Sequence, residues 1–214
     1  MRNRIEAIEY AMNLFNELID CGFDPSQPNS ISLINLPSDI EWASGATRVV
    51  VWRIGADYVI KFGWDAGDEK YCAREYEIYR DAVKFGVSDY FGWCERAIEP
   101  ENNYGIGVYV MEYLNCDEET IDDSSFELAF HNYCEENGVE ENSDSREDFS
   151  EWYWESDEST DTPLEYFLNE IKDCAKRHDV DEFVCNEDIS DLHAGNFGYR
   201  DDTLVICDYA SYGW

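Results

Sequence analysis

The chain has 214 residues, and its 49 acidic residues against 15 lysines and arginines give a formal net charge of −34 at pH 7. Its 44% hydrophobic and 15% aromatic content is enough for a sizeable core, which excludes a long disordered chain. A surface this negative repels nucleic acid and anionic membranes and attracts basic proteins and cations. We therefore expect no direct nucleic-acid binding and a basic protein as partner, while the oligomeric state stays open.

The cysteines and the N-terminal segment favour a cytoplasmic protein. The eight cysteines are spread singly, without a C-x-x-C pair and without clustering with the three histidines, so we expect no zinc site. Residues 1–17 carry charges throughout and offer neither the apolar core of a signal peptide nor a run long enough to cross a bilayer. We therefore expect a reducing, cytoplasmic location, mostly free buried thiols and no membrane association.

Residues 1–38 predict a leading helix followed by a linker. Apolar residues recur at alternating three- and four-residue steps over residues 2–20, which is the spacing of one helical face, and Gly22 follows as a stop. The stripe expected to face the core consists of Ile5, Ile8, Met12, Phe15 and Ile19. Residues 23–38 hold three of the five prolines and are expected to form the linker.

Residues 39–114 predict an antiparallel sheet with one helix packed on it. The expected strands lie near 40–42 and at 49–52, 58–62 and 106–114, and a segment with helical spacing lies at 68–84. A short turn separates the second strand from the third, which is typical of a hairpin. A β-β-β-α-β order of this kind favours the α+β class.

Residues 115–214 predict a mainly helical region. The stretch 115–161 contains 18 acidic residues against Arg146 alone, and its aromatic islands predict short helices docked by one face. Thr162-Pro163 is a favourable helix start, and an apolar stripe predicts that this helix continues through Lys176. The last expected elements are two short strands, near 197–199 and 204–207.

Two motifs near the C-terminus stand out, DLHAGNFG at 191–198 and VICDYA at 205–210. An aspartate-asparagine spacing means little by itself in so acidic a protein. Its context is informative, because an apolar strand ends directly in Asp208 and a predicted helix precedes the first motif. Together the motifs resemble the catalytic half of the protein-kinase-like superfamily, and more closely its aminoglycoside-phosphotransferase-like and phage-encoded branches, where D-x-H-x-G-N is common.

The resemblance implies specific roles in phosphoryl transfer, which asks a protein mainly to position ATP, hold Mg²⁺ and orient a hydroxyl. The family pattern has an aspartate, an asparagine five residues later and a second aspartate on the next hairpin. Here Asp191 matches the residue that orients the nucleophile. Asn196 and Asp208 match the Mg²⁺ ligands, since both offer oxygen atoms to a hard cation. His193 and Gly195 are expected to shape the loop.

The N-terminal half contains a match to the ATP-binding lysine of the same family. Lys61 closes an apolar, β-branched strand, as the family's lysine does, and a buried ammonium there needs an anionic partner. The usual partner is a glutamate on the following helix. Glu75 shares a helical face with apolar residues and is the expected partner, and Glu77 on the polar side is the alternative.

The segment 110–114 resembles the adenine-binding hinge of that family. The resemblance implies that Met111 is the gatekeeper and that backbone groups of Glu112 and Leu114 bind the adenine edge. Gly45 lies in the place of the phosphate-covering loop, where protein kinases have three glycines. A single glycine is a weak signal, so we expect either fewer backbone N–H contacts to ATP there or compensation by the hydroxyl groups of Ser44 and Thr47.

The resemblance as a whole implies an α+β, two-lobed protein-kinase-like fold with an antiparallel N-lobe sheet and a reduced helical C-lobe. Its expected parts are a leading helix and linker at 1–38, the N-lobe and hinge at 39–114, and the acidic C-lobe at 115–214. I-S-D replaces H-R-D and D-Y-A replaces D-F-G, and both keep the aspartate. Trp214 follows Asp208 by six residues, so we expect no activation segment, no late peptide-docking helices and no conventional loop-phosphorylated kinase.

Two functions of different classes are consistent with these features. The first is a minimal, ATP- and Mg²⁺-dependent phosphotransferase that acts on an unknown acceptor, a basic protein or a small molecule. The second is a catalytically silent kinase-like scaffold that binds and inhibits a basic, nucleic-acid-binding protein, as phage-encoded acidic decoys do. Five intact residues favour the enzyme: Lys61, Glu75, Asp191, Asn196 and Asp208. The missing late helices and the single glycine favour the scaffold.

Overall fold

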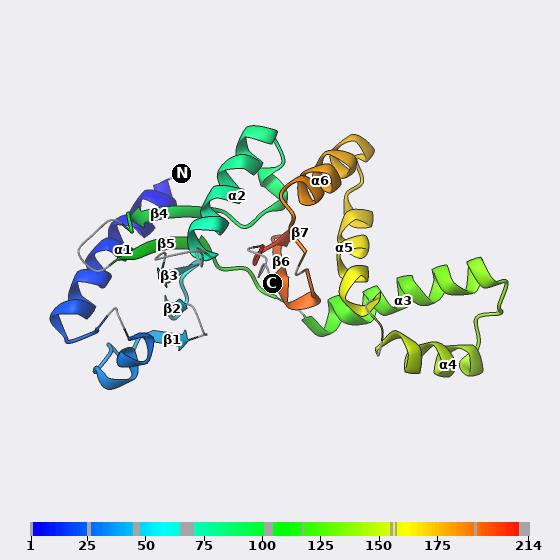
Figure 1. Ribbon diagram of the computed structural model, residues 1–214, viewed down its shortest axis with the longest axis horizontal. Helices are drawn as coiled ribbons and strands as arrows, with labels where there is room; N and C mark the ends of the chain where they lie inside the picture. The colour runs from blue at the N-terminus through cyan, green and yellow to red at the C-terminus, as the bar shows by residue number, and fades with distance from the viewer. Residues whose placement is uncertain are drawn as a thin grey trace. The chain divides into compact units, whose positions relative to one another are not determined.

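The computed structural model describes residues 2–24, 27–44, 48–64, 71–100, 105–116, 118–154, 156, 158–190 and 192–209. Within them lie a five-stranded antiparallel sheet, a two-stranded hairpin and six α-helices, which confirms the α+β class (Figure 1). The chain divides after Leu114 into two compact units, and each is described by itself. No helix among these residues is long and apolar enough to cross a membrane.

The first unit is built on the five-stranded sheet. Its strands are β1 (Ile40–Ser44), β2 (Arg48–Arg53), β3 (Tyr58–Trp64), β4 (Cys94–Ile98) and β5 (Ile106–Glu112). They pair in the order β1-β2-β3-β5-β4, so β3 and β5 are inner strands. The helices are α1 (Arg2–Asp20) and α2 (Tyr71–Phe85), and two short 3-10 turns lie at Pro28–Leu33 and Ser88–Tyr90.

The two helices of this unit cover opposite faces of the sheet. Successive side chains of a strand point to opposite faces. Phe62 of β3 packs on Phe15 of α1, with ring centroids 5.5 Å apart. The preceding residue, Lys61, bonds to Glu75 of α2 on the other face. The predicted leading helix is therefore part of the same core as the sheet.

Helix α1 is present as predicted, but its expected buried stripe is wrong. Ile5 and Met12 are exposed, whereas Phe15 is buried. The stripe that faces the sheet consists of Ala7, Ala11, Leu14, Phe15 and Leu18. Two alanines in this stripe let the helix approach the sheet closely, and alanine carries little weight in a pattern of large apolar residues.

Four strands of the sheet were predicted and the fifth, β4, was not. Its sequence, CERAI, places two charged residues in a run of five. Such a run lacks the apolar pattern of a buried strand, and only Cys94 is fully buried. Among the described strands β4 pairs only with β5, so it lies at an edge of the sheet, where charged side chains are tolerated.

The second unit is mainly helical. Its elements are α3 (Glu118–Asn137), α4 (Ser143–Tyr153), α5 (Glu158–Glu170), α6 (Cys174–Asn186), a 3-10 turn (Ala194–Asn196), β6 (Phe197–Arg200) and β7 (Thr203–Ile206). The β6-β7 hairpin matches the two short strands predicted near the C-terminus. Its first strand also bridges to Asn115, whose carbonyl accepts a hydrogen bond from the Tyr199 N–H at 3.1 Å.

The prediction of one helix from Pro163 through Lys176 is wrong. Helix α5 begins earlier, at Glu158, and contains Pro163. It ends at Glu170, and Asp173 starts a new helix, α6, by accepting hydrogen bonds from the N–H groups of Ala175 and Lys176 at 2.9 and 3.2 Å. Aspartate is a strong N-cap, so its local preference breaks an apolar pattern that reads as continuous.

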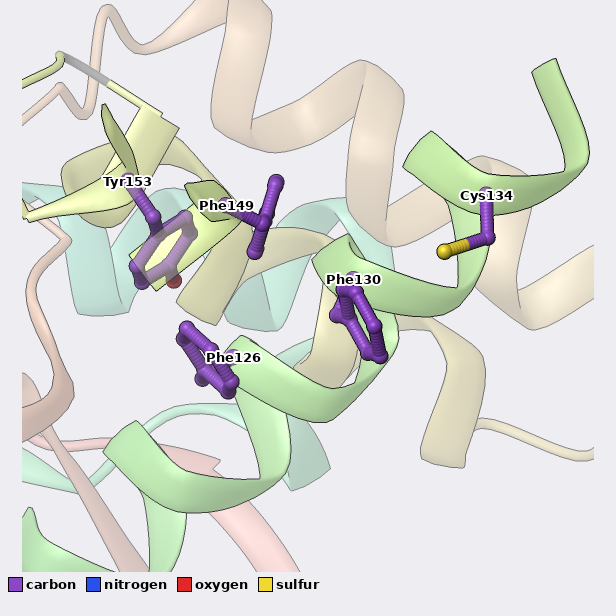
Figure 2. Packing of buried hydrophobic residues seen from close by; sticks show 5 residues of the cluster. All are labelled: Phe126, Phe130, Cys134, Phe149 and Tyr153. Atoms are coloured by element: carbon purple, nitrogen blue, oxygen red, sulfur yellow. The ribbon is translucent and has the colours of Figure 1, made fainter. Parts of the chain in front are cut away.

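Helices α3 and α4 pack through an aromatic seam (Figure 2). The buried members are Phe126, Phe130 and Cys134 from α3 and Phe149 and Tyr153 from α4. Phe126 and Phe130 each lie 5.5 Å from Phe149, measured between ring centroids. Each buried aromatic ring stabilises the packing by about 2 kcal/mol. The predicted docking of these acidic helices by one apolar face is confirmed, but α3, with 20 residues, is not the short helix that was expected.

Candidate functional site

A buried ion pair joins the sheet to helix α2. Lys61 Nζ on β3 donates a hydrogen bond to Glu75 Oε1 at 2.7 Å. Lys61 is 6% exposed and Glu75 is 0% exposed, so both charged groups lie inside the unit. Arg48 on β2 donates to the same carboxylate oxygen at 2.9 Å. Two cationic side chains therefore converge on one buried carboxylate.

The strand register explains why Arg48 and Lys61 reach the same partner. Val50 of β2 lies opposite Lys61, and Arg48 lies opposite Gly63. Residues two apart on a strand share a face, so Arg48 and Lys61 both point toward α2. Arg48 was not predicted as a site residue, because its place opposite Gly63 depends on the strand register, which the sequence pattern did not specify.

The position of Glu75 on α2 follows from helical spacing. Cys72, Glu75 and Tyr79 lie three and four residues apart on one face, and all three are buried. Glu77 lies on another face and is exposed. The pairing of Lys61 with Glu75 in place of Glu77 agrees with the prediction, and the role of the pair in nucleotide binding stays a prediction.

Cys94 on β4 lies close to this ion pair but is not a reactive thiol. Burial raises the pKa of Cys94 well above its ordinary value, and the Glu75 carboxylate raises it further while Lys61 lowers it. A thiol with a raised pKa stays protonated at neutral pH and is a poor nucleophile. The candidate chemistry of this unit therefore rests on Lys61, Glu75 and Arg48.

The predicted hinge lies at the end of β5. Met111 and Leu114 are buried, and Glu112 is half-buried. The Glu112 N–H donates to the Trp93 carbonyl at 2.9 Å, and the Glu112 carboxylate accepts from the Trp93 N–H at 3.1 Å. Because its N–H is engaged in the sheet, adenine recognition by Glu112 would have to use the carbonyl group. The roles of these residues stay predictions.

In the second unit the hairpin brings Asn196 and Asp208 to one end. The backbone N–H of Cys207 donates a hydrogen bond to the backbone carbonyl of Asn196 at 2.8 Å. Asp208 is the next residue after Cys207, so this bond places it near Asn196. Asn196 is buried and Asp208 is half-buried. This end offers one amide and one carboxylate, and Mg²⁺ in nucleotide sites is held by one or two carboxylates plus phosphate oxygens. The donor set therefore fits Mg²⁺ together with a phosphorylated ligand.

His193 shapes the turn that carries Asn196, as expected. Its Nδ1 accepts a hydrogen bond from the Gly195 N–H at 3.2 Å and caps the 3-10 turn. A Cβ added at Gly195 would lie 3.0 Å from His193 Cε1, which is closer than normal contact. An alanine at this position would therefore require the histidine ring to shift by a few tenths of an ångström.

Two predicted site residues, Gly45 and Asp191, lie outside the described residues. Lys61 and Glu75 belong to the first unit, and Asn196 and Asp208 belong to the second. Each pair is brought together within its own unit.

A pair of thiols beside Asp208 was also missed. Cys116 Sγ and Cys207 Sγ lie 3.5 Å apart although the residues are 91 positions apart in sequence. The hydrogen bond with Cys207 lowers the pKa of Cys116, while partial burial and the Asp208 carboxylate act in the opposite direction. No sequence pattern signals this contact, because it depends on the bridge between Asn115 and Tyr199.

Comparisons of the chain with family models, with curated proteins and with solved structures found no match. The interpretation of the site therefore rests on its own residues.

Proposed function

We propose that the protein is a minimal ATP- and Mg²⁺-dependent phosphotransferase of the protein-kinase-like superfamily, with a basic acceptor. In this proposal the first unit is the N-lobe and the second is a reduced C-lobe. All eight cysteines are free thiols, but only Cys72, Cys94 and Cys134 are buried, so the expectation of mostly buried thiols is wrong. Free thiols suit the reducing cytoplasm that we propose as its location.

The buried hydrogen bond between Lys61 and Glu75 is the observation that carries the proposal. Protein kinases hold the ATP phosphates with a lysine of the third strand that pairs with a glutamate of the following helix. Desolvation makes a buried ion pair costly, and an apolar pair of similar volume often leaves a protein equally or more stable. Stability therefore explains the pair poorly, and a phosphorylated ligand explains it well.

The proposed roles follow from residue chemistry. Lys61 binds phosphate oxygens, and Glu75 holds the ammonium in place. Asn196 and Asp208 would hold Mg²⁺, which neutralises charge on the phosphates when bound. Asp191 would accept a hydrogen bond from the acceptor hydroxyl and orient it toward the γ-phosphate.

Thermal shift with Mg-ATP tests nucleotide binding. A ligand present at 100 times its Kd stabilises the folded form by about 2.7 kcal/mol, which raises the melting temperature of a chain this size by about 5 to 10 °C. Lys61→Met should abolish most of this rise, because it removes the phosphate ligand.

Lys84→Met is the matched control, since Lys84 is exposed at the end of α2. It should leave the rise intact. A wild-type melting temperature that does not change at millimolar Mg-ATP would rule out the phosphotransferase.

The acidic segment favours a second candidate, a scaffold that binds a basic protein without catalysis. Residues 115–161 hold 18 acids against one arginine, and the structure folds most of them onto α3 and α4, with side chains exposed on both helices. Such a surface attracts basic proteins whether or not ATP binds.

A further inference from the structure

A groove of about 750 Å³ lies between α3 and α4 of the second unit. Its apolar surface comes from Trp154 and Phe126, whose rings are stacked at a centroid distance of 5.9 Å and an interplanar angle of 8°. Trp154 is 52% exposed, whereas Phe126 belongs to the buried seam between the helices (Figure 2). The Trp154 ring therefore stacks on Phe126 through one face and has exposed surface that a partner can contact.

Three carboxylates line the same groove, Asp123 on α3 and Glu147 and Glu151 on α4, and the one cationic side chain among its described lining residues is Arg146. Glu147 and Glu151 are four residues apart and share a helical face, and Trp154 follows three residues later on that face. All three acids are exposed. Aromatic surface and negative charge therefore meet at one place, where each would attract a cation.

The chain's own Arg146 shows how this kind of surface binds a guanidinium group. Arg146 lies over the rings of Phe126 and Phe130, at 5.0 and 5.5 Å from their centroids. Its guanidinium also donates to Glu127 Oε2 at 2.9 Å. Stacking on an aromatic ring together with a carboxylate pair is the combination that favours arginine over lysine.

We propose that this groove docks an arginine side chain from a basic segment of a partner protein. The guanidinium stacks on the exposed ring of Trp154 and pairs with Glu147 and Glu151. The inference rests on the basic partner that both candidate functions share, and it does not depend on nucleotide binding. A second copy of the chain is a poor occupant, because each copy carries a net charge of −34.

Binding of a labelled nine-arginine peptide, measured by fluorescence anisotropy without nucleotide, tests the inference. The double variant Glu147→Gln/Glu151→Gln should raise the Kd by about tenfold or more, because it removes both carboxylates from the groove. Trp154→Ala should have an effect of similar size. A nine-lysine peptide should bind several-fold more weakly to the wild type, since lysine cannot stack and pair in the same way.

The matched control is Glu9→Gln/Glu17→Gln, which removes two exposed acids from α1 and gives the same net charge. Its Kd should change by less than about twofold, as expected for distant surface charges. Equal weakening in both double variants would overturn the inference in favour of diffuse attraction, as would full binding by Trp154→Ala.

Two further measurements separate this inference from the phosphotransferase proposal. Lys61→Met should bind the peptide as tightly as the wild type. Glu147→Gln/Glu151→Gln should keep the rise in melting temperature with Mg-ATP. If peptide binding fails the groove test while the Mg-ATP rise persists, the docking site is wrong and the nucleotide site stands. If the peptide binds as the groove predicts but Mg-ATP does not raise the melting temperature, the docking site is supported and the phosphotransferase proposal is wrong.

Discussion

Glu75 is the residue on which the first unit's candidate site depends. It accepts hydrogen bonds from Lys61 and Arg48 through the same oxygen, inside the protein. The Lys61 ammonium and the Arg48 guanidinium therefore share one oxygen of this carboxylate. Removing the charge of this carboxylate leaves the buried Lys61 ammonium less compensated, which costs free energy.

Glu75→Gln should destabilise the protein by about 3 to 5 kcal/mol, because it removes the buried negative charge that pairs with Lys61 and Arg48. Urea denaturation measures this loss. Glu77→Gln is the matched control on the same helix, and as an exposed substitution it should stay within about 0.5 kcal/mol of the wild type. Similar stabilities for the two variants would mean that the ion pair contributes little to folding.

Cys116 and Cys207 should form a disulfide when the protein is treated with oxidised glutathione. Their sulfur atoms are 3.5 Å apart, and Cys116 is exposed. The Cys116 thiolate attacks the glutathione disulfide and releases one glutathione. The Cys207 thiolate then attacks Cys116 and releases the second, so two protein thiols are oxidised as one disulfide is reduced.

Peptide mapping by mass spectrometry should find the Cys116–Cys207 cross-link, with the loss of two hydrogens. The exposed Cys174 and Cys185 serve as internal controls and should carry glutathione adducts instead. Stable glutathione on Cys116 of the wild type would contradict the prediction. In Cys207→Ser the adduct on Cys116 should persist, because the second thiol is absent.

At the scale of helices and strands, regular apolar patterns predicted most elements. Strands β1, β2, β3 and β5 lie where alternation placed them, and the hairpin of β6 and β7 follows the last two apolar runs. Where local chemistry competes with the pattern, prediction failed. The N-cap at Asp173 divided one expected helix, and the charged edge strand β4 showed no pattern at all.

The candidate site was predictable in part for the same reason. The resemblance to the kinase-like family implied that Lys61 pairs with a glutamate of the next helix, helical spacing selected Glu75, and the structure joins the two side chains. Contacts that depend on tertiary placement could not be predicted. The approach of Cys116 to Cys207 and the aromatic groove at Trp154 both require helices and strands that are distant in sequence to be packed first.

The connection between α3 and α4 contains a contact that should respond to pH. His131 Nδ1 on α3 lies 2.7 Å from Glu141 Oε1, and this hydrogen bond raises the pKa of His131 above 6.5, with Glu135 adding to the effect. Because the pKa of His131 is raised in the folded state, the contact contributes its full stabilisation of the folded protein at pH values below the ordinary pKa of histidine. The stabilisation is lost as pH rises through the raised value.

The difference in melting temperature between the wild type and His131→Gln should therefore be largest near pH 6 and vanish at higher pH. Comparing the two proteins removes the general effect of pH on so acidic a chain. His178→Gln, an exposed position on α6, is the control. A wild-type advantage that stays constant across this range would show that protonation of His131 has no part in the contact.

The whole molecule carries enough charge to bind basic proteins without any catalysis. Its 49 acids exceed its bases by 34, and 18 of them lie in 115–161. Attraction of this kind acts over a Debye length of about 8 Å at physiological ionic strength and weakens as salt rises. Binding to a basic protein therefore does not separate an enzyme from a scaffold, but loss of one catalytic group does.

Asp191→Asn separates the two functions. If the protein is a phosphotransferase, the substitution removes the group that orients the acceptor hydroxyl, and turnover should fall by about 10²- to 10⁴-fold. Mg-ATP should still raise the melting temperature, because the phosphate and metal ligands are intact. The assay follows transfer of labelled γ-phosphate from ATP to a histone mixture, which supplies basic acceptors, and to water.

The scaffold predicts a different pattern for the same variant, since one charge out of an excess of 34 is a small change. Nine-arginine binding should then be unaffected, and no Asp191-dependent transfer should be seen.

Asp208→Asn is a second probe that acts on the metal ligand, so it should reduce transfer and also the rise in melting temperature with Mg-ATP. Asp202→Asn removes an exposed charge between β6 and β7 and is the matched control for both. Transfer that is lost in Asp191→Asn and Asp208→Asn but kept in Asp202→Asn establishes catalysis, whereas transfer at wild-type rates in all three variants would exclude the proposed active site.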